Sequence, residues 1–553
     1  MQMASPQAIG NCTAGAIPYP AIFGAEFLAI EVRPVWNYNV AGSNINNPYG
    51  INAPKVNFCN ITVTHTHPGQ NDILRTQIWL PFNATWNKRF MMAGGGGWSA
   101  GWTVAPGSMN IAVADGYATS TVDGGLSQES MISVSSWALT SPGNVNYNAL
   151  QDFAFKGLVD GALATKSVIE SFYGIGPDYS YWQGCSQGGR QGYMFAERYP
   201  EIFDGIAANA PAINWNSLFF SALYPQQVLY ELSLDAFPQS CEYDSLTTAA
   251  IAACDSIDGL IDGLIADPDR CLDVFDPLTL VGSPATQCDA SNGLVISKAA
   301  ALAMEAAWKG PRTSNGTRLW YGFASDSILT GFFNILSTIC SDDGSCTPNR
   351  MSLFTDWLKY FVKKDPDFNL NNMTRQEYIS ALHAGEREYA SILNTNYPDL
   401  SEFRKSGGKL LTYHGMADQL ISYRGTRDYY NKASALDASL RDFYRYFEAP
   451  GAAHCVAGQG GVPDSFPALV AWVEKGIAPE TLVATNKEEK ERLLCMYPKK
   501  TIFKGDPSNY TADDFVCGPD ESNVLDRTHW TEQGVAFLGQ MQVGVKGLLS
   551  NMF

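Results

Sequence analysis

The stretch YSYWQGCSQGGRQGYMFAERYP, residues 179–200, decides the expected fold. It contains Gly184-Cys185-Ser186-Gln187-Gly188, which fits the G-x-S-x-G turn that raises a serine hydroxyl off the end of a sheet. A strand over 179–182 precedes this turn, and a helix over 189–199, ended by a proline, follows it. The glycines are needed because a β-carbon would clash where the backbone reverses. The pentapeptide alone also occurs by chance, so the rest of the chain must supply partners for Ser186.

Two later strands lead to an acid and a histidine, in the order that the α/β-hydrolase fold requires. The apolar run 409–413 leads to Asp418, and the run 444–447 leads to His454. We therefore predict an α/β fold of the α/β-hydrolase type. Ser186 is the expected nucleophile, His454 takes and returns the proton, and Asp418 orients the imidazole. The reaction class that this set supports is hydrolysis of an acyl ester.

A run of four glycines, residues 94–97, follows a predicted early strand. Ester hydrolysis needs two backbone N–H donors for the oxyanion, one from the residue after the nucleophile and one from such a loop. The predicted donors are the N–H groups of Gln187 and Gly96. The alternative is that the glycines form only a flexible turn.

A cysteine stands next to each of two catalytic candidates: Cys185 precedes Ser186, and Cys455 follows His454. If these cysteines form a disulfide, their Cα atoms lie about 4.4 to 6.8 Å apart, and the nucleophile and base become neighbours. This set, together with the acid and the glycine-rich loop, resembles the tannase and feruloyl esterase family of secreted carboxylesterases over most of the chain. The resemblance implies an α/β-hydrolase core with a large inserted lid, and hydrolysis of esters of phenolic acids such as ferulic or gallic acid.

Length and composition are those of a large globular protein. The 553 residues, of which 45% are hydrophobic and 12% aromatic, suffice for one hydrolase core plus an inserted domain. No apolar run reaches the roughly 18 residues of a membrane span, so no membrane partner is expected. Residues 1–6 lack the apolar stretch of a signal peptide, so we expect the chain to begin at or near the mature start. A net charge of −18 leaves no basic stripe for nucleic acid, which is excluded as a partner.

Cysteines and sequons indicate a secreted, extracellular protein. The chain has 12 cysteines, an even number, which suits disulfides formed in an oxidising compartment. A zinc site is the competing explanation, but the sequence has no C-x-x-C pair with a matching partner. Sequons for N-glycosylation begin at Asn11, Asn60, Asn83, Asn315, Asn372 and Asn509.

The family resemblance also implies particular disulfides. Besides Cys185 with Cys455, it implies Cys12 with Cys59, Cys254 with Cys271, and Cys495 with Cys517. Cys340 and Cys346 then close a short loop, and Cys241 is left with Cys288.

The strand and helix pattern of the core is interrupted near Asn214. Short apolar, loop-bounded segments that fit buried strands come before it, at 76–80, 88–93, 117–122 and 204–210. A long segment of different character follows, and the core pattern resumes after about Ser401. Hydrolases of this fold place a lid between the strand after the elbow and the strand carrying the acid. We therefore assign residues 1–213 and 401–553 to the catalytic domain and residues 214–400 to a lid domain.

Several carboxylates lie within one segment of the predicted lid. Asp255, Asp258 and Asp262, at spacings of three and four, could place hard oxygen ligands around one point, as calcium prefers. The alternative is a solvated acidic turn, since the ligand spacing is not that of an EF-hand. The family's lid calcium resembles this arrangement, which implies carboxylate ligands from these three residues and carbonyl ligands from Leu260 and Leu264. We expect the ion to be structural, because hydrolysis by serine, histidine and aspartate needs no metal.

Other polar residues give weaker signals. His414 lies four residues before Asp418 and could face the site, but a buried, hydrogen-bonded role is favoured. His65 and His67 alternate along a probable strand and so share one face, a spacing typical of metal ligands, with no third ligand in view. Asp123 follows an early strand, and we favour a role in holding its loop.

The sequence leaves the acyl group of the substrate open. Our first choice is a feruloyl esterase acting on hydroxycinnamoyl esters of plant cell-wall polysaccharides, and tannase, acting on galloyl esters, is the alternative. The two activities share every motif above and differ in lid residues that pair with the ring hydroxyls. A non-catalytic binding protein on the same fold would need a broken triad or oxyanion loop, which this chain does not have. The lid aromatics, most of which belong to its core, are Trp215, Phe219, Phe220, Tyr224, Tyr230, Trp308, Trp320, Tyr321, Phe323, Phe332, Phe333, Phe354 and Trp357.

Overall fold

The structure, a computed structural model, describes residues 12–40, 54–82, 84–126, 128–232, 237–289, 293–342 and 344–519. The sequons at Asn11 and Asn83 and the N-terminal residues 1–6 lie outside the described residues. The expectations about these positions therefore stay predictions.

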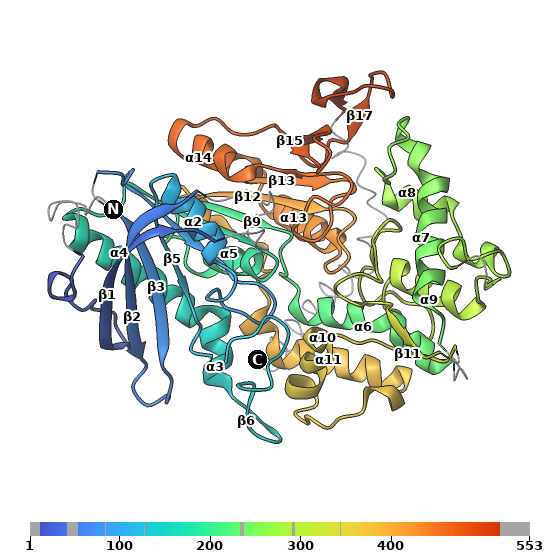
Figure 1. Cartoon of the computed structure of the whole chain (residues 1–553), viewed down its shortest axis with the longest axis horizontal. Coiled ribbons are helices and arrows are strands. Elements are labelled where there is room, and N and C mark those ends of the chain that lie inside the picture. Colours follow the sequence, from blue (N-terminus) through green and yellow to red (C-terminus); the bar gives the residue numbers. More distant parts are fainter. Residues whose placement is uncertain are drawn as a thin grey trace, which may run out of the picture.

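A nine-stranded sheet forms the centre of the molecule (Figure 1). Its N-terminal strands pair in antiparallel fashion up to β5, and the strands from β5 to β13 run parallel. In spatial order the strands are β1 (Glu26–Tyr38), β2 (Val56–Thr66), β3 (Leu74–Pro81), β5 (Ala118–Val122), β4 (Arg89–Ala93), β8 (Tyr179–Cys185), β9 (Gly205–Asn209), β12 (Lys409–Gly415) and β13 (Tyr444–Ala449).

Helices cover both faces of this sheet because successive side chains of a strand point to opposite sides. In β8, Tyr181 contacts Phe466 on one face, whereas Trp182 contacts Phe195 on the other. The first face is covered by α2 (Pro106–Ala114) and α14 (Ser465–Lys475), and the second by α4 (Gly157–Tyr173), α5 (Gln187–Arg198) and α13 (Tyr423–Leu436). This three-layer arrangement is that of an α/β hydrolase, as predicted.

The sheet incorporates all four early segments expected to be strands: they fall in β3, β4, β5 and β9. Strands β9 and β12 are neighbours in the sheet, yet about 200 residues separate them in the chain. That insertion contains α6 (Trp215–Glu231), α7 (Ser240–Cys254), α8 (Pro268–Val274), α9 (Lys298–Lys309), β10 (Thr338–Cys340), β11 (Cys346–Pro348), α10 (Ser352–Asp356), α11 (Arg375–Leu393) and α12 (Ser401–Lys405). The division at residues 214 and 400 remains our prediction.

The inserted helices dock on the core through Trp98, which follows the glycine-rich loop. Its ring lies 5.4 Å from that of Phe219 and 5.5 Å from that of Phe361. Its indole N–H donates to the carbonyl of Leu353 at 3.1 Å. One hydrophobic core therefore runs from the sheet into the insertion.

Six disulfides stabilise the described part of the chain, in the pairs given above: Cys12–Cys59, Cys185–Cys455, Cys241–Cys288, Cys254–Cys271, Cys340–Cys346 and Cys495–Cys517. The remaining short elements are β6 (Leu139–Ser141), β7 (Asn144–Val145), α3 (Tyr147–Gln151), β14 (Val462–Pro463), β15 (Thr481–Thr485), β16 (Glu491–Cys495), β17 (Thr501–Phe503) and β18 (Phe515–Cys517). Among the described residues, none of the helices combines the length and the hydropathy that a membrane span requires.

Candidate active site

Ser186 occupies a strained turn between β8 and α5. Its backbone has φ 64° and ψ −121°, a conformation that non-glycine residues rarely adopt. The turn is tight: a β-carbon on Gly184 would lie 2.5 Å from the backbone of Gly188, and one on Gly189 would lie 2.5 Å from the carbonyl of Asn209. The glycines around Ser186 are therefore required by the space available, as the sequence predicted.

Asp418 and His454 meet at the ends of β12 and β13. His454 Nδ1–H donates to Asp418 Oδ2 at 2.8 Å, while the backbone N–H groups of Leu420 and Ile421 donate to Oδ1 at 2.8 and 2.7 Å. Burial alone would raise the pKa of Asp418, but the electrostatic attraction of His454 and the side-chain hydrogen bonds from His414 and His454 hold that pKa well below its ordinary value. Asp418 is therefore a carboxylate that fixes the tautomer of His454.

The second ring nitrogen of His454, Nε2, is not engaged by any described residue. His454 Nε2 is buried and has no hydrogen-bond partner among the residues that the structure describes. With Nδ1 protonated toward Asp418, Nε2 carries the lone pair that a general base uses.

A disulfide joins the residues next to Ser186 and His454 across 270 residues of chain. The Cα atoms of Cys185 and Cys455 are 6.0 Å apart, and both residues are buried. Because Ser186 and His454 each adjoin one of these cysteines, the covalent link limits how far the two can separate.

The glycine-rich loop is clamped against the serine turn. Gly188 N–H donates to the carbonyl of Gly95 at 3.0 Å, and Gly95 N–H donates to Gln191 Oε1 at 2.8 Å. Gly96 N–H donates to the carbonyl of Ser99 at 3.2 Å, so this particular N–H is already engaged within the loop. Gln187 is the first residue of α5, where helix geometry leaves the N–H without an intrahelical acceptor.

His414 is a buried histidine that also contacts the acid. Its Nε2–H lies 3.1 Å from the carbonyl of Ile421 and 3.2 Å from Asp418 Oδ2, and its Nδ1 accepts from Thr426. The favoured interpretation as a hydrogen-bonded core residue agrees with this geometry, and the contact with Asp418 also places the ring next to the predicted site, the alternative that the sequence left open. Asp123, as favoured, holds its loop: its carboxylate accepts from the backbone N–H of Gly125 within that loop at 2.9 Å and from that of Arg75 in β3 at 2.8 Å.

One segment of the insertion contacts Asp418 and His454. The ring of Phe333 lies 5.4 Å from that of His454 in an edge-on arrangement, and Ser327 Oγ is 3.5 Å from the carbonyl of Asp418. Next to them, Phe332 is 68% exposed and Ile328 is 57% exposed. The insertion thus places the Phe333 ring beside His454, with two exposed apolar side chains in the same segment. No pattern in the sequence had selected Phe333 from among the other aromatic residues.

The predicted calcium loop folds around Asp255. Its carboxylate accepts from the backbone N–H groups of Asp262 and Gly263 at 3.1 and 2.9 Å. Arg492 contacts Asp258 at 3.3 Å and Asp262 at 2.7 Å, so a guanidinium already faces two of the three carboxylates. Within the described residues, the three carboxylates do not form a group whose oxygens all lie within 4.8 Å of one another.

The chain is similar to known proteins over most of its length. The family model described as tannase and feruloyl esterase matches residues 59–518. A probable feruloyl esterase of Arthroderma benhamiae is 35% identical, with 94% of this chain and 95% of the relative covered.

Two solved structures share the fold across most of the chain. The tannin acyl hydrolase of Aspergillus niger has a TM-score of 0.79 and 27% identity, covering 92% of this chain and 95% of its own. Feruloyl esterase B of Aspergillus oryzae has a TM-score of 0.72 and 26% identity, covering 90% of this chain and 97% of its own. The chain therefore belongs to the tannase and feruloyl esterase family of carboxylic ester hydrolases.

Proposed function

We propose that the protein is a serine carboxylesterase that works through an acyl-enzyme on Ser186. The observation that carries this proposal is the state of His454, whose Nδ1 is bound to Asp418 at 2.8 Å while its buried Nε2 has no partner among the described residues. The strained turn at Ser186 and the disulfide between the neighbouring cysteines support it.

The reaction follows from these positions in two steps. Ser186 Oγ attacks the acyl carbon while its proton passes to His454 Nε2, and the imidazolium is stabilised by Asp418. The proton then passes to the leaving alcohol as the ester C–O bond breaks. Water attacks the acyl-enzyme by the same route and releases the acid and Ser186. Gln187 N–H is the proposed first oxyanion donor, and we place the second donor in the loop 94–97; the engagement of Gly96 N–H with Ser99 argues against Gly96 itself.

For the acyl group, we propose a hydroxycinnamate such as ferulate esterified to a plant cell-wall polysaccharide. The relative from Arthroderma benhamiae is a probable feruloyl esterase. In this chain, the lid segment whose Phe333 ring lies beside His454 also exposes Phe332 and Ile328. An apolar wall suits a ring with one hydroxyl and a methoxy group better than the three hydroxyls of gallate, which need polar partners. Tannase activity is the second candidate because a tannin acyl hydrolase has the same fold with a TM-score of 0.79.

Methyl ferulate, methyl caffeate and methyl gallate, compared under identical conditions, separate these two candidates. We expect kcat/KM to be at least about tenfold higher for the two cinnamates, because unpaired galloyl hydroxyls would be buried against apolar side chains. A preference for gallate would make the enzyme a tannase with the same catalytic residues. Absence of turnover on all three esters would instead favour a non-catalytic binding protein.

We also propose a structural calcium ion in the lid, held by carboxylates of Asp255, Asp258 and Asp262 and by carbonyls of Leu260 and Leu264. Two observations support the proposal: these are the hard oxygen ligands that calcium takes, and Asp262 Oδ1 is buried with no hydrogen-bond partner in the described structure. The three carboxylates would have to converge, and Arg492 would have to give up its contacts with Asp258 and Asp262, for the ion to bind. The ion would tie the loop to one centre and would supply no step of the ester hydrolysis.

Calcium is expected to raise the melting temperature of protein that has been treated with EGTA, because the ion binds only the folded loop. Asp255→Asn should abolish this rise, since it removes one charged ligand from the centre of the loop. Asp273→Asn, at an exposed position on α8, is the matched control and should keep the full rise. If added calcium leaves the melting temperature of the wild type unchanged, Arg492 alone neutralises the loop.

Secretion is the proposed localisation. The six disulfides suit an oxidising compartment. Of the sequons within the described residues, those at Asn315, Asn372 and Asn509 are exposed, whereas Asn60 is buried in β2. The three exposed asparagines are therefore the proposed glycan positions there.

A further inference from the structure

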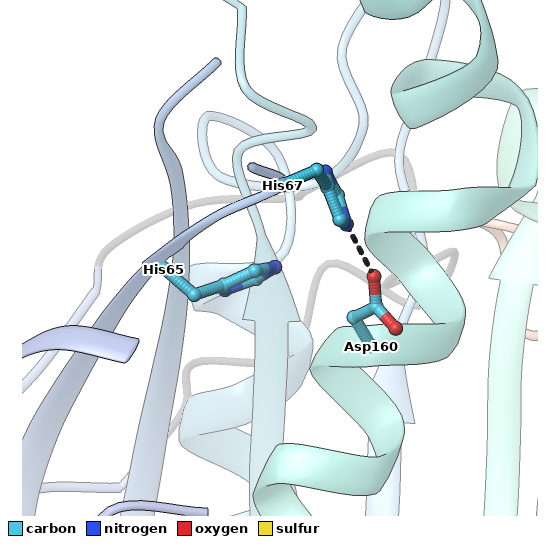
Figure 2. Close-up of side chains that lie close together, drawn as sticks. All are labelled: His65, His67 and Asp160. Atoms are coloured by element: carbon cyan, nitrogen blue, oxygen red, sulfur yellow. Dashed lines mark hydrogen bonds and ion pairs between the residues drawn. The ribbon is translucent and has the colours of Figure 1, made fainter. Parts of the chain in front are cut away.

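A second cluster of ionisable groups lies between β2 and α4 and shares no residue with the triad. His65 belongs to β2, His67 follows the end of that strand, and Asp160 projects from the first turn of α4 (Figure 2). One ligand atom from each of the three lies within 4.8 Å of the others, and all three residues are buried. The third ligand that the sequence did not show comes from a helix 93 residues after His67.

His67 is held at both ring nitrogens. Its Nδ1 lies 2.6 Å from Asp72 Oδ2, and its Nε2 lies 2.8 Å from Asp160 Oδ2. Asp72 is itself fixed, because it accepts from the backbone N–H of His67 at 2.7 Å and from the hydroxyl of Thr66 at 2.8 Å. A carboxylate that accepts from one nitrogen of a histidine and thereby directs the other at a metal is the usual support of a zinc-binding imidazole.

His65 gives independent evidence for a ligand. It is 0% exposed, and neither of its ring nitrogens has a hydrogen-bond partner among the described residues. A buried imidazole in this state has lost its water without gaining a partner, which is unfavourable. Figure 2 shows the ring directed from β2 toward the space between His67 and Asp160.

A further carboxylate, that of Asp152, lies close to His67. Asp152 lies in the π-helical turn Asp152–Lys156 before α4 and is fully buried. Its Oδ1 is 3.7 Å from His67 Nδ1. Asp72, Asp152 and Asp160 thus all lie close to His67, where a divalent cation would compensate the negative charge of the carboxylates.

We propose that this cluster is a structural site for a divalent transition metal of the zinc class, bound by His65, His67 Nε2 and Asp160, with Asp72 orienting His67. Two imidazoles with one carboxylate favour zinc over calcium or magnesium, which prefer ligand sets made of oxygen alone. The metal would replace the proton between His67 Nε2 and Asp160 Oδ2. The distance between these two atoms, 2.8 Å in this structure, would then increase to about 3.3 Å, because each would bond to a tetrahedral metal at about 2.0 to 2.1 Å. The site would fasten the N-terminal strands to α4.

Metal content is the first test. The full chain, purified without a polyhistidine tag, is stripped with a chelator, dialysed, and loaded with Zn²⁺ alone. We expect about one zinc per chain by elemental analysis, a rise in melting temperature, and two imidazole ligands in the zinc X-ray absorption spectrum. Co²⁺ in place of zinc should give the visible bands of a tetrahedral site.

Variants assign the metal to this cluster. His65→Gln and Asp160→Asn should each lose the bound zinc and the cobalt bands, whereas His383→Gln, at an exposed histidine of α11, should keep both. Asp255→Asn should also keep the zinc, which separates this site from the lid loop. Two results on the wild type would overturn the proposal, whether or not the variants fold: binding of neither Zn²⁺ nor Co²⁺, or a zinc spectrum without imidazole ligands. Full zinc binding by His65→Gln would also overturn it. In those cases the cluster is an ion-paired histidine network.

Discussion

Ser186→Ala is expected to lower kcat/KM for methyl ferulate by about 10⁴-fold or more while leaving the fold intact. Alanine removes the only atom that forms the acyl-enzyme, and it retains a β-carbon, so the backbone of the turn is unchanged. The variant should therefore unfold at nearly the same temperature as the wild type. Steady-state kinetics and the melting temperature, measured on the same preparation, check both parts of this expectation.

Ser180→Ala provides the matched control for this variant. Ser180 is buried in the same strand, β8, six residues before the nucleophile. Its hydroxyl has no part in the proposed chemistry, so kcat/KM should stay within a few-fold of the wild type. Retention of ester hydrolysis by folded Ser186→Ala would remove Ser186 from the mechanism.

Simultaneous replacement of Cys185 and Cys455 by alanine is expected to lower kcat/KM by about 10- to 100-fold, because displacing reacting groups by about 1 Å can cost that much. The Cα atoms of these residues are 6.0 Å apart and hold the segments of Ser186 and His454 together. Losing a link that closes so long a loop should also lower the free energy of unfolding by about 2 to 5 kcal/mol. Rates must therefore be measured at a temperature where circular dichroism shows both proteins to be folded.

The disulfide between Cys340 and Cys346 is the control for this experiment. It joins β10 to β11 in the insertion and spans only 6 residues. Its replacement by two alanines removes the same chemical group without touching the triad segments, so kcat/KM should change little. If the Cys185 and Cys455 variant kept its full rate while losing stability, that disulfide would stabilise the fold without positioning the catalytic residues.

Local patterns were enough to predict the fold class, and they also select the three residues that we propose as the triad. The turn at Ser186 is encoded by glycines whose β-carbons would collide with the backbone, and such a constraint is visible in sequence. Asp418 and His454 could be chosen because each follows an apolar run, and parallel strands bring their carboxyl ends to one edge of the sheet.

Contacts that depend on packing between distant segments could not be predicted. His414 lies beside Asp418 on the same strand end, but its hydrogen bond to that acid depends on the path of the loop that follows. Phe333 was one aromatic among thirteen, and only the docking of the lid brings it to His454. Likewise, Asp160 meets the two N-terminal histidines because α4 packs on the sheet there. The periodicity of apolar residues predicts which face of a helix or strand is buried, but it does not predict which other segment packs against that face.

Covalent labelling with an aryl phosphonate ester tests the proposed mechanism most directly. Such a reagent reacts with a serine only when a base activates it and an oxyanion hole accepts the phosphoryl oxygen. We predict that esterase activity falls in proportion to the incorporation of one phosphonyl group per chain, and that tandem mass spectrometry places this group on Ser186. Loss of activity with the label on another residue, or full activity in chains labelled at Ser186, would contradict a Ser186 acyl-enzyme.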